Sequence, residues 1–172
     1  MKEGEILKIT QTLSDNIHKL EKGLVTIIIP VMLITMALDI FFRYFLSSPL
    51  VWAQELALYS FVWSGFIGAS MSIKAKEAVA VTLIVDKIQS KLKNILIMIG
   101  LLASIGFSIY VLYLSITWII NPTILLQKSI TTQMPMIYMY LSIPVSIFFM
   151  TIHFINWFFE SLQFTREGKV IE

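Results

Sequence analysis

The stretch Asp39-Ile-Phe-Phe-Arg-Tyr-Phe-Leu-Ser-Ser-Pro-Leu-Val-Trp-Ala-Gln-Glu55 joins two long hydrophobic segments of this chain. It places an acid and a base, Asp39 and Arg43, at the end of the first segment. Gln54 and Glu55 follow near the start of the second. Charged side chains in or beside a membrane span are costly and usually serve a purpose. This connection therefore indicates both the fold class and the first candidate functional residues.

The composition predicts an all-α membrane protein. Of the 172 residues, 57% are hydrophobic and 14% are charged, whereas soluble domains average about 25% charged. A helix needs about 20 apolar residues to cross the hydrocarbon core, and no long apolar segment alternates as a barrel strand would. One domain, 23–160, is therefore expected to hold four transmembrane helices. The predicted spans are 24–42, 50–73, 95–120 and 134–159.

The distribution of positive charge predicts the topology. Arg43 and Lys128 lie on one side of the predicted spans, and the other Lys and Arg residues lie in the remaining segments. Such a bias places both termini in the cytoplasm. Residues 1–22 carry apolar positions spaced by three and four, which predicts an amphipathic helix lying on the inner leaflet. Residues 161–172 form the expected cytoplasmic tail.

Several function classes lack their signatures in this sequence. It contains no cysteine and no glycine-rich loop ending in Gly-Lys-Ser/Thr, so neither a thiolate metal site nor a P-loop is expected. The two histidines, His18 and His153, are far apart and have no partners at metal-ligand spacing. The charged N-terminal segment does not resemble a removable signal peptide. No enzyme, no metal site and no nucleic-acid partner is predicted, since the net charge of +2 comes mostly from the lysines that set the topology.

Local signals predict how the spans begin and bend. Ser48 is expected to cap the second helix with Pro49 at its first position. Pro144 should kink the fourth span near Tyr140, because its ring clashes with the carbonyl four residues earlier. The apolar piece 78–85 is too short to span a membrane, and we expect it to pack under the bundle.

The polar residues of the first connection predict a clasp. Asp39 and Arg43 are spaced i, i+4 with the acid first, the favourable order for a helical ion pair. Glu55 is a second candidate partner for Arg43, and Gln54 stands beside it. Three roles remain open for this set: a clasp between the two helices, a contact with another subunit, or direct handling of an ion or substrate.

Small residues recur along the second and third spans at intervals of about four. Such positions let helix backbones approach closely, because lipid supplies no hydrophobic drive for helix association. They predict either packing within the bundle or docking against a larger partner. The residues are Ser60, Ser64, Gly65, Gly68, Ala69 and Ser72 in the second span, and Gly100, Ser104 and Ser108 in the third.

Aromatic residues mark the expected membrane interfaces. Tyr44, Trp52 and Trp118 fall near the outer surface and Trp157 near the inner one, where aromatic anchors concentrate. Trp63 lies in mid-span and is expected to pack between helices. We interpret His153 as a hydrogen-bonded packing residue rather than a proton relay.

The order of motifs in the first half of the chain resembles a known family. Arg43-Tyr44, Pro49-Leu-Val-Trp52 and Gln54-Glu55-Leu are followed by Phe61-Val-Trp63, by the Gly- and Ala-rich run 65–69, and by Val85-Asp-Lys87. This order is similar to that of the small membrane subunit of TRAP (tripartite ATP-independent periplasmic) transporters, the DctQ-like family. Gln54 stands where the family's acidic pair has its first Glu.

The resemblance implies a specific function. The family's small subunit pairs with a large membrane subunit that carries the sodium and substrate sites, and a periplasmic binding protein delivers the substrate. The substrates are organic acids such as C4-dicarboxylates or sialic acid. This chain would then be a scaffold embedded in membrane lipid, with no cofactor of its own and with sodium coupling in the large subunit. One alternative is a self-sufficient ion- or proton-coupled transporter that uses Asp39 or His153. A membrane enzyme would need a clustered nucleophile or metal set.

Overall fold

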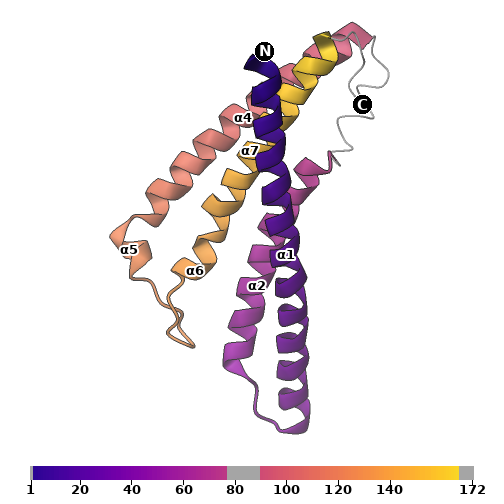
Figure 1. Cartoon of the computed structure of the whole chain (residues 1–172). Coiled ribbons are helices and arrows are strands. Elements are labelled where there is room, and N and C mark those ends of the chain that lie inside the picture. The colour runs from indigo at the N-terminus through magenta and orange to yellow at the C-terminus, as the bar shows by residue number, and fades with distance from the viewer. Residues whose placement is uncertain (1, 77–89, 167–172) are drawn as a thin grey trace.

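Helices make up nearly all of the part of the chain that the structure describes, residues 2–76 and 90–166 of a computed structural model (Figure 1). No strand occurs in these two ranges, where Lys128 and Pro135 form an isolated bridge. The segment 78–85 and the motif at 85–87 lie outside the described residues. The helices are α1 (Lys2–Phe45), α2 (Val51–Lys74), α4 (Ser90–Ile119), α5 (Pro122–Leu125), α6 (Ile137–Tyr140) and α7 (Ser142–Arg166).

Four helical segments are long and apolar enough to cross a membrane, as predicted. They are Glu5–Phe45, Val51–Lys74, Lys93–Ile119 and Ile137–Thr165. Large apolar side chains such as Ile27, Leu33 and Phe107 remain exposed on their outer faces. An apolar exterior of this kind suits a lipid environment, where it carries no penalty.

The first helix differs from the prediction, because α1 is one continuous helix of 44 residues. A separate amphipathic helix was expected over residues 1–22, but from Lys2 onward this segment runs directly into the first span. Neither Gly23 nor Pro30 ends the helix, and its N-terminal half packs against α7 through Ser14 and Glu21, which are buried. At 1.5 Å per residue α1 is about 66 Å long, roughly twice the hydrocarbon thickness of a bilayer.

The helices form two pairs. α1 packs along α2, α4 packs along α7, and α7 also contacts both α1 and α2. Figure 1 shows the pairs close together at the end that holds the N-terminus, which we call the N-terminal end. They diverge toward the opposite end, which we call the hairpin end and which holds the 46–50 turn, α5 and α6. Contacts at the N-terminal end therefore join helices that lie close together, whereas contacts at the hairpin end must span the space between the diverging pairs.

The start of α2 departs from the expected cap. The helix begins at Val51, two residues later than expected, and Leu50 occupies the cap position without a side-chain hydrogen bond. The N–H of Leu50 instead donates to Asp39 Oδ1 at 3.0 Å. The prediction of a Ser48 cap is therefore wrong, because a carboxylate from the neighbouring helix satisfies this end of α2.

The break in the fourth span lies where the proline predicts it. α6 ends at Tyr140 and α7 begins at Ser142. Pro144 then occupies the first turn of α7, where its missing N–H costs no internal hydrogen bond. The predicted kink near Tyr140 is confirmed.

The contacts between helices are made by small side chains. On α2 the buried face consists of Ala53, Ala57, Ser60, Ile67 and Ser70. On α7, Ser142 and Ser146 are fully buried at a spacing of four. Small residues bring backbones close, so that dispersion contacts and short hydrogen bonds hold the helices together. Small residues therefore predominate on the buried faces of α2 and α7, where Ile67 and Ile147 are the large apolar side chains that are also buried.

Candidate functional site

Asp39 is the centre of the polar cluster at the hairpin end. Its side chain is largely buried on α1 and accepts three hydrogen bonds. Arg43 Nη2 donates to Oδ2 at 2.6 Å, Leu50 N to Oδ1 at 3.0 Å and Gln54 Nε2 to Oδ2 at 3.2 Å. The predicted Asp39–Arg43 pair is therefore present, and Gln54 joins it. One carboxylate ties together the end of α1, the turn and the first residues of α2.

Glu55 does not join this cluster. It accepts hydrogen bonds from the hydroxyls of Ser129, Thr131 and Thr132 in the connection between α5 and α6. The expected pair of Glu55 with Arg43 is therefore wrong. Successive residues of a helix point about 100° apart, so when Gln54 faces α1, Glu55 faces elsewhere, and Asp39 already neutralises Arg43.

The connection that Glu55 holds is an ordered loop. Ser129 N donates to the carbonyl of Met134 at 2.8 Å, and Met136 N donates to the carbonyl of Gln127 at 3.0 Å. Ile130, between the bound hydroxyls, is 96% exposed. The sequence reasoning missed this contact, although a run with three hydroxyls within four residues, 129–132, was a usable signal for carboxylate binding.

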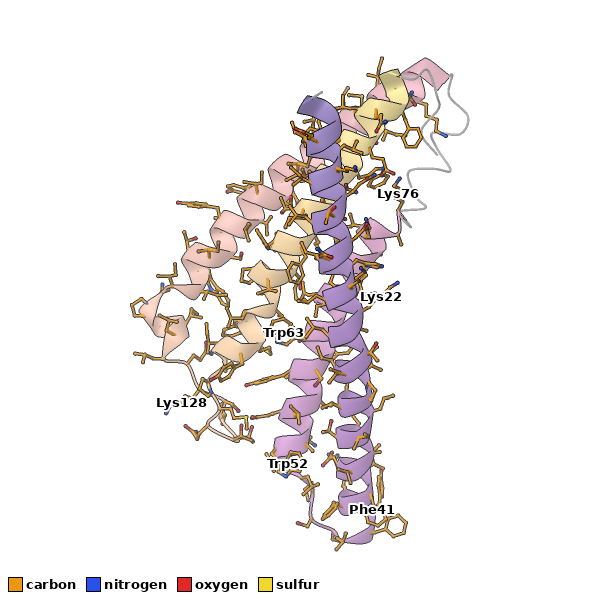
Figure 2. All side chains as sticks on the ribbon, in the orientation of Figure 1. Lys22, Phe41, Trp52, Trp63, Lys76 and Lys128 are labelled. Carbon is orange, nitrogen blue, oxygen red and sulfur yellow. The ribbon has the colours of Figure 1, made fainter. Side chains whose placement is uncertain are left out.

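Trp63 makes a second contact between the two helix pairs. Its Nε1 donates to the carbonyl of Tyr138 at 2.8 Å, and in Figure 2 the labelled side chain lies on the side of α2 that faces α6. The expected packing role of Trp63 is confirmed. Trp63 and Glu55 thus connect α2 to α6 and to the loop before it, although the two helix pairs diverge at this end.

The glycines of the small-residue stripes do not pack inside the chain. Gly65, Gly68, Ala69 and Ser72 are exposed, and so is Gly100. A Cβ added at any of these three glycines would meet nothing within 4 Å. The prediction of packing within the bundle is thus wrong for these positions, because the buried face of α2 lies on another side of the helix. Of the remaining stripe residues, Ser60 and Ser108 are buried, and Ser64 and Ser104 are half-buried.

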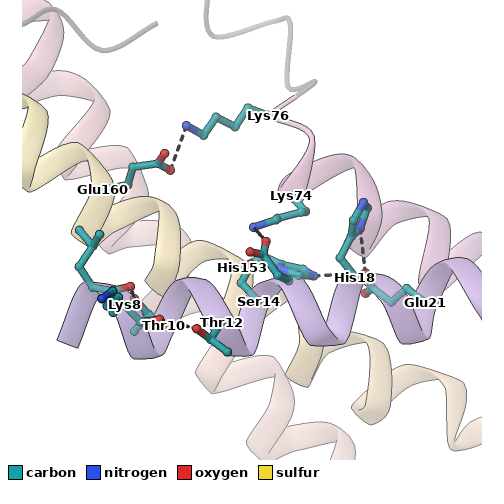
Figure 3. Close-up of polar contacts among 12 residues, drawn as sticks. Lys8, Thr10, Thr12, Ser14, His18, Glu21, Lys74, Lys76, His153 and Glu160 are labelled. Carbon is teal, nitrogen blue, oxygen red and sulfur yellow. Dashed lines mark hydrogen bonds and ion pairs between the residues drawn. The ribbon is translucent and has the colours of Figure 1, made fainter. Parts of the chain in front are cut away.

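The two histidines meet at the N-terminal end, around a buried carboxylate (Figure 3). His153 Nδ1 lies 2.8 Å from Ser14 Oγ, and its Nε2 lies 3.2 Å from Glu21 Oε2. His18 Nδ1 lies 3.6 Å from the same oxygen. The two histidines, far apart in the sequence, are therefore close together in the fold, with ring centroids 6.4 Å apart. The interpretation of His153 as a hydrogen-bonded packing residue is confirmed, because it ties α7 to α1.

The hydrogen bonds of His153 fit a neutral imidazole ring. With the neutral tautomer protonated at Nε2, His153 donates to the Glu21 carboxylate and accepts from the Ser14 hydroxyl. Among the described residues, no group of three or more His, Cys, Asp or Glu side chains is placed to hold a metal ion. The arrangement therefore suits a buried polar tie between helices.

Two ion pairs complete the N-terminal end. Lys74 Nζ lies 2.8 Å from Asp15 Oδ1, joining α2 to α1, and Lys76 Nζ lies 3.0 Å from Glu160 Oε2, joining the segment after α2 to α7. Figure 3 shows both lysines reaching across from the end of α2. Three helices are thus linked at this end by charged and hydrogen-bonded side chains.

The predicted interface aromatics lie at the two ends of the helices. Tyr44, Trp52 and Trp118 are exposed near the hairpin end, and the Trp118 ring also contacts the Tyr140 ring at a centroid distance of 4.8 Å. Trp157 is half-buried near the N-terminal end. Their positions are those of membrane anchors, and the anchoring role stays a prediction.

The fold has four apolar helices of membrane length, and its hydrogen-bonded polar clusters lie near the helix ends. These features are those of a multi-pass membrane protein. Sequence comparison gives the family. The profile of the family described as "Tripartite ATP-independent periplasmic transporters, DctQ component" matches residues 20–164. The chain belongs to this family of transporter components, as its motif order predicts.

Two characterised relatives share about a quarter of their matched residues with this chain. The C4-dicarboxylate TRAP transporter small permease protein DctQ of Rhodobacter capsulatus is 26% identical over 121 residues, 70% of this chain and 52% of the relative. The isethionate TRAP transporter permease protein DctMQ of Oleidesulfovibrio alaskensis is 26% identical over 110 residues, 64% of this chain. The match spans 17% of DctMQ, so the chain corresponds to about half of the first relative and a small part of the second.

Proposed function

We propose that this chain is the small membrane subunit of a TRAP transporter, and that it scaffolds a large transport subunit during uptake of an organic acid. The family match across all four spans carries this proposal. The two relatives are named for a C4-dicarboxylate and for isethionate, both small organic anions. A small carboxylate or similar organic acid, such as a C4-dicarboxylate or sialic acid, is therefore the proposed substrate class.

The proposed location is the bacterial inner membrane, with both termini in the cytoplasm. The bias of Lys and Arg toward the N-terminal end supports this orientation. The loop held by Glu55 and the Asp39 cluster then face the periplasm. A periplasmic binding protein would deliver substrate on that side.

The proposed partner is a large membrane subunit, which would hold the sodium and substrate sites. The open glycine face of α2 supports a partner, since Gly65 and Gly68 have room beside them that no part of the described chain fills. In the DctMQ relative the matched part is only 17% of the protein, which suits a small component working beside a much larger one.

A co-purification experiment tests the partner. The tagged chain is co-expressed with a candidate large TRAP subunit, and the complex is isolated in mild detergent. Gly68→Leu should reduce recovery of the complex about tenfold, because overpacking a close helix contact costs about 1–3 kcal/mol. Gly106→Leu on α4 is the matched control, since that glycine is also open but lies outside the stripes. Equal recovery of both variants would contradict the assignment of the α2 face.

Reconstitution tests the function itself. Uptake of a labelled organic acid into proteoliposomes should require the chain, the large subunit and the binding protein together, and an inward sodium gradient. Omission of this chain should abolish uptake. Uptake by the purified chain alone would instead establish the rival interpretation, a self-sufficient transporter.

A further inference from the structure

A polar cavity of about 350 Å³ lies at the N-terminal end of the bundle. It is formed where α1, the end of α2 and α7 come together, close to the His153 tie described above. This volume falls within the range of small-molecule sites, roughly 300–1,000 Å³. Its lining includes Asp15, Lys74, Lys76, Asn156, Trp157 and Glu160.

The charges around the cavity are balanced. Lys74 pairs with Asp15 and Lys76 pairs with Glu160, so two ammonium groups and two carboxylates surround it. All four side chains are partly exposed, and such ion pairs are weak enough to exchange partners. An anionic ligand that took a lysine would leave a carboxylate unpaired. A ligand with one phosphate and one ammonium group can replace both partners of a pair at once, and no charge is stranded.

Two of the lining residues also carry buried polar atoms without a protein partner. They are Asn156 Oδ1, an acceptor, and Trp157 Nε1, a donor. Asn156 is 5% exposed. Buried polar groups are hydrogen-bonded in the great majority of cases. Both atoms are almost wholly inaccessible, so they lie behind the cavity wall, and a ligand reaches them only if neighbouring side chains move.

The position of the cavity along α2 supports a place at the depth of lipid head groups. Lys74 is the first charged residue on α2 after Glu55, so the apolar length of that helix ends at Ile73. Trp157 is of the residue type that concentrates at the boundary between hydrocarbon and water. A ligand at this level is more readily supplied by the membrane than by the aqueous phase.

We propose that this cavity binds the head group of a zwitterionic phospholipid with a primary ammonium group, as in phosphatidylethanolamine. The phosphate takes the two lysines, and the ammonium takes the two carboxylates. Sites for anionic lipids are basic pockets, whereas here acids equal bases. A choline head group has no N–H donor for the carboxylates. This inference goes beyond the proposed function, because it concerns a lipid site within this chain.

The test uses the full-length chain, purified and stripped of lipid in detergent. Phosphatidylethanolamine, phosphatidylcholine and phosphatidylglycerol with identical acyl chains are added in turn, and occupancy is measured by native mass spectrometry. Phosphatidylethanolamine should be retained at least about fivefold better than the other two, a difference of roughly 1 kcal/mol. Equal retention of all three lipids would overturn the proposal. If soluble phosphoethanolamine at the same concentration displaced the lipid, the proposal that the membrane supplies the ligand would be wrong.

Exchanging the charges of Lys76 and Glu160 tests the role of the ion pairs directly. Lys76→Glu should abolish the preference for phosphatidylethanolamine, and the double change Lys76→Glu with Glu160→Lys should restore it, since one acid and one base again face the cavity. A single Lys76→Glu variant that folds and keeps the preference would contradict the proposal. Folding is checked by thermal unfolding of each variant, independently of any complex with the large subunit.

Discussion

The two ends of the bundle use carboxylates in different ways. At the hairpin end, the donors to Asp39 lie within fifteen residues of it along the chain. At the N-terminal end, Glu21 and His153 are separated by 132 residues. The first cluster shapes one helix hairpin, whereas the second joins the first helix of the chain to the last. The Asp39 cluster is therefore local to one hairpin, whereas the Glu21 cluster depends on the packing of two helices that are distant in the chain.

The two clusters also differ in burial. The side chains of Glu21 and His153 are both 0% exposed, while that of Arg43 is 47% exposed. A buried charged group that loses its partner keeps its desolvation penalty, but an exposed one regains water. The N-terminal end should consequently contribute more to stability, and the hairpin end more to the shape presented on that side of the protein.

The largest effect is expected from His153→Leu. This change leaves Glu21 buried without its closest partner, and breaking a buried pair from one side costs about 3–5 kcal/mol. The measurement is the free energy of unfolding of the purified chain in detergent. The double variant Glu21→Leu with His153→Leu should recover part of the loss, because no charge is then stranded. His18→Leu is the control, because that ring is partly exposed. If His153→Leu lowered the free energy of unfolding no more than His18→Leu does, the N-terminal end would not have the larger role in stability.

Asp39→Ala should have the next largest effect. It removes the acceptor of three hydrogen bonds and frees the N–H of Leu50 at the start of α2. Arg43→Ala removes only one of these bonds, so it should lower the melting temperature less. The measurement is thermal unfolding of both variants side by side. The reverse order would show that the positive charge, and not the shared acceptor, organises this cluster.

A smaller and more local effect is expected from Glu55→Ala. Its hydroxyl partners Ser129, Thr131 and Thr132 would lose their common acceptor, and the loop would detach from α2. Amide hydrogen exchange in 127–136 should rise at least about tenfold while α7 is unchanged, since loops open independently of the helices that flank them. Glu55→Gln, which keeps one acceptor oxygen, is the milder control. Unchanged exchange in the alanine variant would show that the loop holds its own shape.

The smallest effect on the isolated chain is expected from Gly68→Leu. Open space surrounds this glycine, so the unfolding free energy should change by no more than about 0.5 kcal/mol. The same variant should impair assembly with the large subunit, as described above. A large loss of stability in the isolated chain would place this face inside the bundle after all.

Local patterns in the sequence were enough to predict much of the fold. The four spans follow from runs of apolar residues, because a helix satisfies its own backbone hydrogen bonds and hydrocarbon length sets its minimum size. The Asp39–Arg43 pair follows from i, i+4 spacing, and the break before α7 follows from the ring of Pro144. The family follows from the order of motifs over residues 43–87. All of these depend on residues that are close together in the chain.

The tertiary structure decided which faces and which partners meet. Periodicity marked the small residues of α2, but whether Gly68 or Ala57 faces a neighbour depends on how α1 and α7 pack against that helix. Rotation by one residue likewise separates Gln54, which reaches Asp39, from Glu55, which reaches the loop at 129–132. The meeting of His18, Glu21 and His153 requires the first and last helices to lie side by side. No spacing along the chain encodes such contacts, because they form only when distant helices pack.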